Sequence, residues 1–351
     1  MKAVLGLEDG EFVVGEGFGA EGCTSGELVF TTQMTGYMEA LTDPSYAGQL
    51  LMFTFPMIGN YGVDGQNFQS PAVNALGCVT REVCAAPAKG PSIIDFFESN
   101  GLLGISGVDT RRLTIKTRTH GTMRAALIAG SDDGEEAVRM ARAVPDISEK
   151  DLLSQVSCST PYRIPGKGKR IAVIDLGIKK NIAISLRRRG ADLHIFPYNT
   201  KASEIETYEP DALFITNGPG DPRSATDAIA TVRHFIGELP IYGICMGNQI
   251  CALALGGETY KMKFGHRGSN QPVRHMDGKI YITTQNHGFA VDGNTLPEGC
   301  KIAYTNVNDG SLEGFCDDDL NIFCVQFHPE AHGGPLDTER PIFDMMYRRI
   351  A

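Results

Sequence analysis

The clearest change in the hydrophobic pattern of the chain lies around residue 245. Residues 240–244 form a short apolar run that suits a buried strand, and residues 248–255 are good helix formers that end at a Gly-Gly pair. The sequence therefore predicts a strand, a sharp turn and a helix, with Cys245 in the turn.

The same alternation covers the second half of the chain. Apolar runs predict strands, and stretches of helical spacing between them predict helices: strands at 170–176, 193–197, 212–215 and 322–327, and helices at 179–189, 202–208, 226–236 and 341–348. This order is typical of an open, mostly parallel sheet with helices on both faces. Ligands of such sheets bind at the carboxyl ends of the strands.

The first half has a different pattern, in which short β-like runs are separated by turns. Helices are expected at 92–98 and 132–144 and from residue 107 onward, a strand is expected at 122–129, and turn formers predict loops at 33–49 and 55–62. We expect a mixed α/β domain with many short strands at 1–153, a polar linker at 154–169, and the parallel-sheet domain at 170–351.

A G-x-G-x-x-G motif at residues 17–22 does not indicate a nucleotide site. Such a fingerprint must open a helix within a β-α-β unit, whereas the segment after Gly22 reads as another turn and strand. We interpret these residues as hairpin glycines.

Composition and charge exclude several classes of function. The 351 residues include 32 Lys and Arg against 42 Asp and Glu, so the formal charge is 32 − 42 = −10, which disfavours nucleic acid and anionic membranes as partners. Nine scattered cysteines without C-x-x-C, no signal peptide and no apolar run near the roughly 20 residues of a membrane span suggest a reduced, cytoplasmic protein. His287 and His332 lack metal-ligand spacing, and we expect no metal.

The turn at Cys245 carries the first candidate chemistry. Residues 243–247 form G-x-C-x-G, the thiol version of the nucleophile elbow, in which small neighbours let the turn close. The start of the following helix would stabilise a thiolate at Cys245. The alternative is a buried structural cysteine.

A nucleophilic cysteine needs a base, and the base needs a group that orients it. His328 and Glu330 follow the strand at 322–327, and Pro329 between them keeps the backbone extended. Residues two apart on an extended segment face the same side, which suits an imidazole held by a carboxylate. The alternative is a solvated strand end.

These motifs resemble those of a known family. G-I-C-M-G-N-Q at 243–249 and Q-F-H-P-E at 326–330, together with T-N-G-P-G-D-P at 216–222 and Q-N-H-G-F-A at 285–290, resemble the class I (triad-type) glutamine amidotransferases, which have a flavodoxin-like sheet. M-T-G-Y-M-E-A-L-T-D-P-S-Y at 34–46 and P-M-I-G-N-Y-G at 56–62 narrow the resemblance to the small subunits of carbamoyl-phosphate synthetase, over essentially the whole chain.

The resemblance implies a set of site residues. It implies a catalytic triad of Cys245, His328 and Glu330, and a glutamine site formed by Ser45, Gly218, Gly220, Met246, Gln249, Asn286, Gly288 and Phe289. The N–H groups of Met246 and Gly220 would hold the oxyanion. Where the family usually has Leu and His, this chain has Met246 and Asn248.

The resemblance also implies the activity. Glutamine would be hydrolysed through a thioester at Cys245, and ammonia would pass to a large subunit that makes carbamoyl phosphate from bicarbonate for arginine and pyrimidine biosynthesis. ATP and Mg would bind that partner, with no cofactor in this chain, in a heterodimer or higher oligomer. Another class I amidotransferase, a free-standing γ-glutamyl hydrolase and an inactive regulatory partner are the alternatives. The N-terminal domain argues against the first two, and the complete triad argues against the last.

Overall fold

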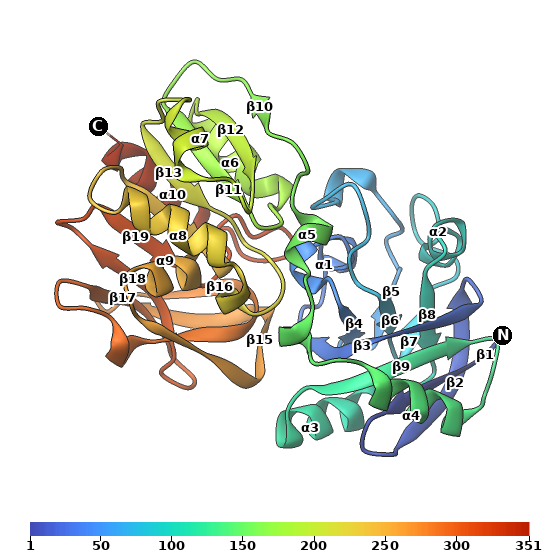
Figure 1. The fold of residues 1–351 in the computed structure, drawn as a ribbon. Helices are drawn as coiled ribbons and strands as arrows, with labels where there is room; N and C mark the ends of the chain where they lie inside the picture. The colour runs from blue at the N-terminus through green and yellow to red at the C-terminus, as the bar shows by residue number, and fades with distance from the viewer. Residues whose placement is uncertain (351) are drawn as a thin grey trace. The chain divides into compact units, whose positions relative to one another are not determined.

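The computed structural model describes residues 1–350, which form two compact units (Figure 1). The first unit runs from Met1 to Lys150, and the second begins at Asp151. No helix within residues 1–350 combines the length and apolar character needed to cross a membrane.

The first unit is built around a closed barrel of seven strands in the order β1-β2-β8-β6-β4-β3-β9. These strands are β1 (Lys2–Leu7), β2 (Phe12–Gly19), β3 (Gly22–Thr31), β4 (Gln49–Phe53), β6 (Gly77–Val79), β8 (Leu103–Ser106) and β9 (Met123–Ala129). Buried side chains such as Leu5, Leu50 and Leu127 fill one core cluster. A separate pair of short strands consists of β5 (Met57–Ile58) and β7 (Glu82–Val83).

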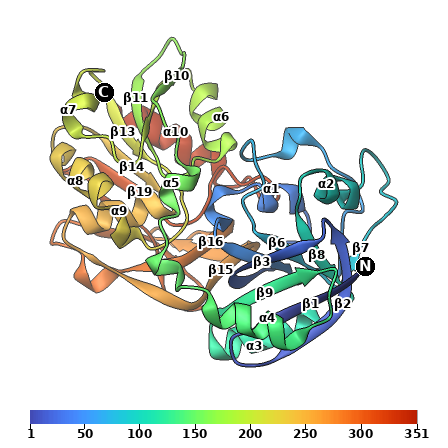
Figure 2. The same ribbon diagram turned by 45° about the vertical axis from the view of Figure 1, so that its right-hand side comes forward.

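Four helices accompany the barrel: α1 (Tyr37–Leu41), α2 (Ile93–Ser99), α3 (Thr110–His120) and α4 (Gly134–Ala143). Helix α4 lies along β1 and β9 (Figures 1 and 2). The close approach of this helix explains why residue 6 is a glycine, because a Cβ on Gly6 would lie 2.4 Å from the Ala137 carbonyl carbon. Ser92, Asp109 and Asp133 accept hydrogen bonds from the first turns of α2, α3 and α4, as N-caps do.

Two sequence expectations for this unit were wrong. Strands β2 and β3 follow each other without a helix, but they do not pair, so the glycines at 17–22 do not form a hairpin: closing the barrel sends β2 to β1 and β8, and β3 to β4 and β9. The loop expected at 33–49 contains α1, because Tyr37, Met38 and Leu41 are buried and their packing outweighs the local turn signals.

The second unit is built on a ten-stranded sheet in the order β10-β12-β11-β13-β14-β19-β18-β17-β15-β16. Its parallel part contains β12 (Asp192–Pro197), β11 (Arg170–Asp175), β13 (Ala212–Ile215), β14 (Ile241–Ile244) and β19 (Ile322–Val325). Antiparallel strands extend it on both sides: β10 (Tyr162–Ile164), β15 (Glu258–His275), β16 (Ile280–Asp292), β17 (Lys301–Asn306) and β18 (Leu312–Asp317).

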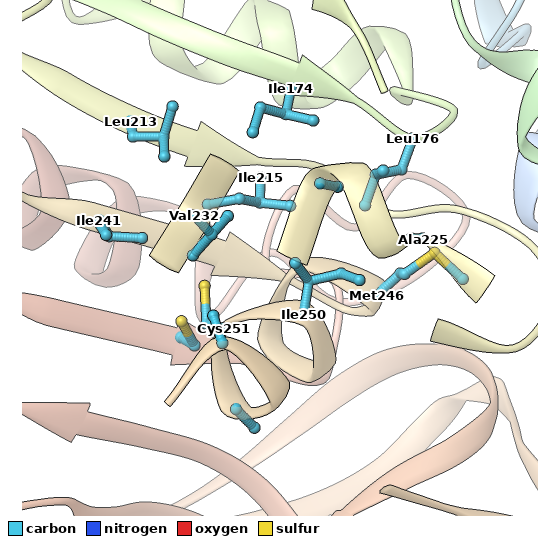
Figure 3. Close-up of a cluster of buried hydrophobic side chains, with 14 of the residues drawn as sticks. Ile174, Leu176, Leu213, Ile215, Ala225, Val232, Ile241, Met246, Ile250 and Cys251 are labelled. Carbon is cyan, nitrogen blue, oxygen red and sulfur yellow. The ribbon is translucent and has the colours of Figure 1, made fainter. Parts of the chain in front are cut away.

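Six helices belong to this unit: α5 (Leu153–Val156), α6 (Lys180–Arg188), α7 (Ala202–Glu206), α8 (Thr226–Phe235), α9 (Met246–Ala254) and α10 (Glu339–Arg349). Apolar side chains of α7, α8 and α9 pack on one face of the sheet, where Ile215, Val232 and Ile250 meet (Figure 3). Those of α6 and α10 pack on the other face. The strands are therefore buried on both sides, which explains their continuous apolar runs.

Two segments of this unit differ from the sequence expectations. The polar segment 154–169 carries most of α5 and the edge strand β10, which pairs with β12, so it is part of the second unit rather than a bare linker. Residues 285–290, for which the hydrophobic pattern predicted no strand, lie within β16. Their polar side chains are buried rather than solvated, which hid the strand in the hydrophobic pattern.

Candidate active site

The turn between β14 and α9 holds Cys245 in a strained conformation. Its φ of 57° and ψ of −106° lie in a region that L-residues with side chains avoid. A Cβ on Gly243 would lie 2.5 Å from the Gly247 backbone, and one on Gly247 would lie 2.2 Å from the Ile215 carbonyl oxygen. Both glycines of G-x-C-x-G are therefore required for the turn to close.

The neighbouring strands fix the position of the Cys245 sulfur. The Cys245 N–H donates to the Val325 carbonyl at 2.8 Å, and its Sγ lies 3.6 Å from the Asn286 carbonyl oxygen. The side chain is 2% exposed and forms the N-cap position of α9. A helix N-terminus favours negative charge, so the position suits a thiolate.

His328 and Glu330 lie just beyond the end of β19, and both are buried. The His328 Nδ1 is 2.8 Å from the Glu330 Oε1, the contact expected for an imidazole oriented by a carboxylate. The backbone of His328 is itself fixed, because its N–H donates to the Thr284 carbonyl at 2.8 Å. The His328 Nε2 is left without a hydrogen-bond partner among residues 1–350.

Sequence reasoning missed Lys179, which completes this group. Its Nζ lies 2.8 Å from the same Glu330 Oε1, and its side chain is only 5% exposed. Lys179 follows the carboxyl end of β11, as Cys245 follows β14 and His328 follows β19. The rule that sites form at carboxyl strand ends could have identified it.

The charges of these groups shift one another's pKa. Burial alone would raise the pKa of Glu330, but Lys179 and His328 lower it to about 2. Burial and the Lys179 charge oppose protonation of His328, but Glu330 and Cys245 outweigh them and raise its pKa to about 9. The arrangement thus favours an imidazolium at His328 beside an ionised Glu330.

The loop after β13 packs closely against the segment that follows β11. A Cβ on Gly218 would lie 2.3 Å from the Leu176 carbonyl oxygen, and Gly220 has a φ of 88°, so both positions favour glycine. The Thr216 Oγ1 accepts from the Leu176 N–H at 2.9 Å, and the Asn217 Oδ1 accepts from the Lys179 N–H at 3.1 Å. These bonds fix the loop to the segment after β11.

Gln249 connects α9 to the strand that carries the other predicted substrate contacts. Its Nε2 donates to the Phe289 carbonyl at 2.8 Å and to the Gln326 Oε1 at 3.1 Å. Asn286, Gly288 and Phe289 lie in β16, and the Asn286 carbonyl also contacts the Cys245 sulfur. The structure therefore places Gln249 and this strand beside Cys245, which Met246 follows directly as the first residue of α9.

Comparison with known proteins establishes the family. The sequence-family model described as carbamoyl-phosphate synthase small chain, CPSase domain, matches residues 5–127. The family model described as glutamine amidotransferase class-I matches residues 172–348. The chain belongs to the carbamoyl phosphate synthase small chain family. Curated small chains from Methanosarcina mazei and Methanosarcina acetivorans are each 57% identical over 357 residues, and the one from Methanopyrus kandleri is 47% identical over 348 residues. The alignments cover 98%, 98% and 97% of this chain and 97%, 97% and 96% of the relatives.

Ser45, the remaining residue predicted to contact glutamine, belongs to the first unit. It lies in the 3-10 turn Pro44–Tyr46 and is buried, and its N–H donates to the Asp43 Oδ1 at 2.9 Å. The structure thus shows how the turn is held. A contact of Ser45 with glutamine stays a prediction.

A buried polar cluster joins strands β15, β16, β17 and β18. His266 faces a carboxylate with each ring nitrogen: the Glu313 Oε1 lies at 3.1 Å and the Asp309 Oδ2 at 2.9 Å. Burial would lower the pKa of His266, but the Glu313 and Asp309 carboxylates outweigh it and raise the pKa above its ordinary value. His287 is close by, and its Nδ1 lies 2.8 Å from the Phe289 carbonyl oxygen.

The ligand atoms of His266, His287 and Glu313 lie within 4.8 Å of one another, close enough to consider a metal. The Asn306 amide nitrogen, however, points into the same space, 3.0 Å from the Glu313 Oε1 and 3.3 Å from the His266 Nδ1. Its orientation is fixed, because the Asn306 Oδ1 accepts from the Asn308 N–H. A hydrogen-bond donor there disfavours a cation, and the absence of a metal stays our prediction.

Proposed function

We propose that this chain hydrolyses glutamine to glutamate and ammonia, and that it passes the ammonia to a large, ATP-dependent subunit that makes carbamoyl phosphate from bicarbonate. The observation that carries the proposal is the buried group of Cys245, His328 and Glu330 at the carboxyl edge of the parallel strands. In a member of the carbamoyl phosphate synthase small chain family, this group fits a glutaminase.

The first half of the reaction forms a thioester. The Cys245 thiolate attacks the side-chain amide carbon of glutamine, and the carbonyl oxygen becomes an oxyanion. The N–H groups of Met246 and Gly220 are the proposed donors to that oxygen, and removing one such donor typically costs about 3 kcal/mol of transition-state stabilisation. His328 then gives its proton to the nitrogen, and ammonia leaves.

The second half regenerates the enzyme. His328, now neutral, takes a proton from water as the water attacks the thioester carbon, so that glutamate and the thiolate are released and the imidazolium forms again. Glu330 stabilises this imidazolium and fixes the ring orientation through the Nδ1 contact. Lys179 holds the same carboxylate oxygen and keeps Glu330 ionised.

Gln249 has one hydrogen-bonding function left for the substrate. A primary amide carries two N–H donors and one carbonyl acceptor, and both donors of Gln249 already have acceptors at Phe289 and Gln326. Its Oε1 is thus suited to the α-ammonium group of glutamine. Backbone groups of Asn286, Gly288 and Phe289, and Ser45 from the first unit, are the proposed further contacts.

The remaining chemistry would take place on the partner subunit. The large subunit would bind ATP and Mg, whereas this chain would need no cofactor. The two would form a heterodimer or a higher oligomer, and their product would serve arginine and pyrimidine biosynthesis.

The test replaces the nucleophile in the complex. We expect Cys245→Ser to abolish glutamine-dependent synthesis of carbamoyl phosphate but to leave ammonia-dependent synthesis intact, because a hydroxyl is not ionised at neutral pH. Cys251→Ser is the matched control: Cys251 is also buried and lies on the same helix, within the apolar core, so both activities should persist. Loss of both activities in Cys245→Ser would show that the thiol has a structural role.

A further inference from the structure

Gln326 lies two residues before His328, directly after β19, and none of its surface is exposed. Its backbone N–H donates to the Glu313 carbonyl at 2.8 Å, which anchors it to β18. Its side chain points back to α9, where its Oε1 accepts from the Asn248 Nδ2 and from the Gln249 Nε2, both at 3.1 Å. Three buried amide side chains therefore meet beside the nucleophile.

The direction of these amides matters, because an amide side chain can be turned to exchange its oxygen and nitrogen with little change in shape. A backbone carbonyl cannot be exchanged in this way. The Phe289 carbonyl accepts from the Gln249 Nε2 and so gives the Gln249 amide one direction. The Gln326 oxygen accepts its second hydrogen, and the Asn248 amide donates to that same oxygen.

Without Gln326, only the Phe289 carbonyl would hold the Gln249 amide. One N–H of a buried amide would then have no acceptor, which is unfavourable, and rotation about the side chain would no longer be opposed from two sides. With Gln326 present, turning the Gln249 amide would bring its oxygen against two acceptors at once. Gln326 thus reinforces the direction that the Phe289 carbonyl gives to the Gln249 amide.

We propose that Gln326 is a positioning residue that holds the Gln249 oxygen toward the α-ammonium group of the substrate. It thereby contributes to the choice of an α-amino acid amide over an amide without the amino group. This inference rests on the proposed glutaminase function. Gln326 itself has no contact with the substrate in this account and acts only through Gln249.

The experiment compares two substrates in the full chain. Glutamine and glutaramate (4-carbamoylbutanoate) have the same amide and carboxylate, but glutaramate lacks the α-ammonium. In Gln326→Met, which keeps the volume and removes the acceptor, we expect kcat/KM for glutamine to fall by about 10- to 30-fold, mainly through KM, as for the loss of one hydrogen bond to a charged group. The kcat/KM for glutaramate should stay within about 3-fold.

Two further variants separate positioning from a structural role. Gln326→Glu keeps an acceptor for Gln249, so it should retain more of the preference for glutamine than Gln326→Met does. Asn248→Ala removes a neighbouring donor but leaves both Gln249 contacts, so the ratio of the two substrates should stay near that of the wild type. Thermal melting of each variant confirms that it is folded.

An equal fall for both substrates in Gln326→Met, or no change for either, would overturn the positioning role. A loss of preference in Gln326→Glu as large as in Gln326→Met would also overturn it. If the wild-type chain hydrolyses neither substrate, the proposed function fails, and the role of Gln326 fails with it.

Discussion

Replacing Glu330 by Gln tests the charge at the centre of the site. The change keeps the shape of the side chain and its ability to accept a hydrogen bond, but it removes the negative charge. That charge is shared by His328 and Lys179, each 2.8 Å from the Glu330 Oε1, and all three side chains are at most 5% exposed. The variant would leave a buried Lys179 ammonium without its anion.

Two independent estimates give the expected loss of folding stability. The pKa of Glu330 is lowered from 4.5 to about 2, because Lys179 and His328 together outweigh the opposing effect of burial. A shift of that size corresponds to about 3 kcal/mol of folding free energy at neutral pH. Removing one partner of a buried ion pair costs about 3–5 kcal/mol in other proteins. We expect Glu330→Gln to lower the free energy of unfolding by about 3 kcal/mol.

Turnover should fall as well, because the carboxylate stabilises the imidazolium. We expect glutaminase turnover to fall by about 10- to 100-fold, less than the full contribution of a general acid–base group. The pKa of His328 should fall below its present value of about 9, so the alkaline limit of activity should move to lower pH. Urea unfolding, steady-state rates and a pH–rate profile measure the three effects.

Asp192→Asn is the matched control. Asp192 is also a buried carboxylate in the second unit, but its partner Arg163 is 57% exposed and stays solvated without it. This variant should lose about 1 kcal/mol or less and keep full turnover. The reasoning is refuted if Glu330→Gln is as stable as Asp192→Asn, or if its turnover equals that of the wild type.

Three further outcomes follow from the same site. Gly247→Ala should reduce the free energy of unfolding by more than about 2 kcal/mol and abolish turnover, because the new Cβ would lie 2.2 Å from the Ile215 carbonyl oxygen; a stable and active variant, by urea titration and assay, would contradict the need for glycine in the elbow. His328→Asn should impair turnover more than Glu330→Gln, and the double variant should be little worse than His328→Asn alone; additive losses would show that the two act independently. The stability that the Glu330 charge contributes is present above the unfolded pKa of about 4.5 and should be lost as pH falls toward about 2; acid titration of the wild type and Glu330→Gln should show the difference between them shrinking over that range, and a constant difference would argue against the assigned shift.

The sequence revealed those parts of the site that depend on local spacing. The change of period at Cys245, the two glycines beside it and the two-residue separation of His328 and Glu330 are local features, and each corresponds to the geometry observed. Lys179 and Gln326 were missed because their roles depend on which strands are neighbours. Its place after β11 makes Lys179 a candidate site residue, but nothing near it in the chain indicates that β11 ends close to the segment after β19, where its partner Glu330 lies.

The hydrophobic pattern also predicted only part of the fold. Alternating apolar runs predicted the parallel strands, since those strands are buried on both faces. They did not predict the barrel order, because strands as short as Gly77–Val79 have no period of their own, and pairing between distant segments decides their register. Residues 285–290 of β16 were hidden because the buried side chains of Gln285 and His287 are polar and are held by hydrogen bonds.

The contacts among Lys179, Glu330 and His328 also join distant parts of the sheet edge. Lys179 follows β11 and Glu330 follows β19, and β13 and β14 lie between those strands in the sheet. The ion pair therefore spans the carboxyl ends of four neighbouring strands, β11, β13, β14 and β19. This edge of the sheet cannot open without separating two buried charges. Amide hydrogen exchange in the loops after β11 and β19 should accordingly be slow and should accelerate together when either charge is removed. Catalytic activity should therefore be lost in the same step in which this sheet edge opens. On heating, the enzyme should stay active until the temperature at which the edge opens.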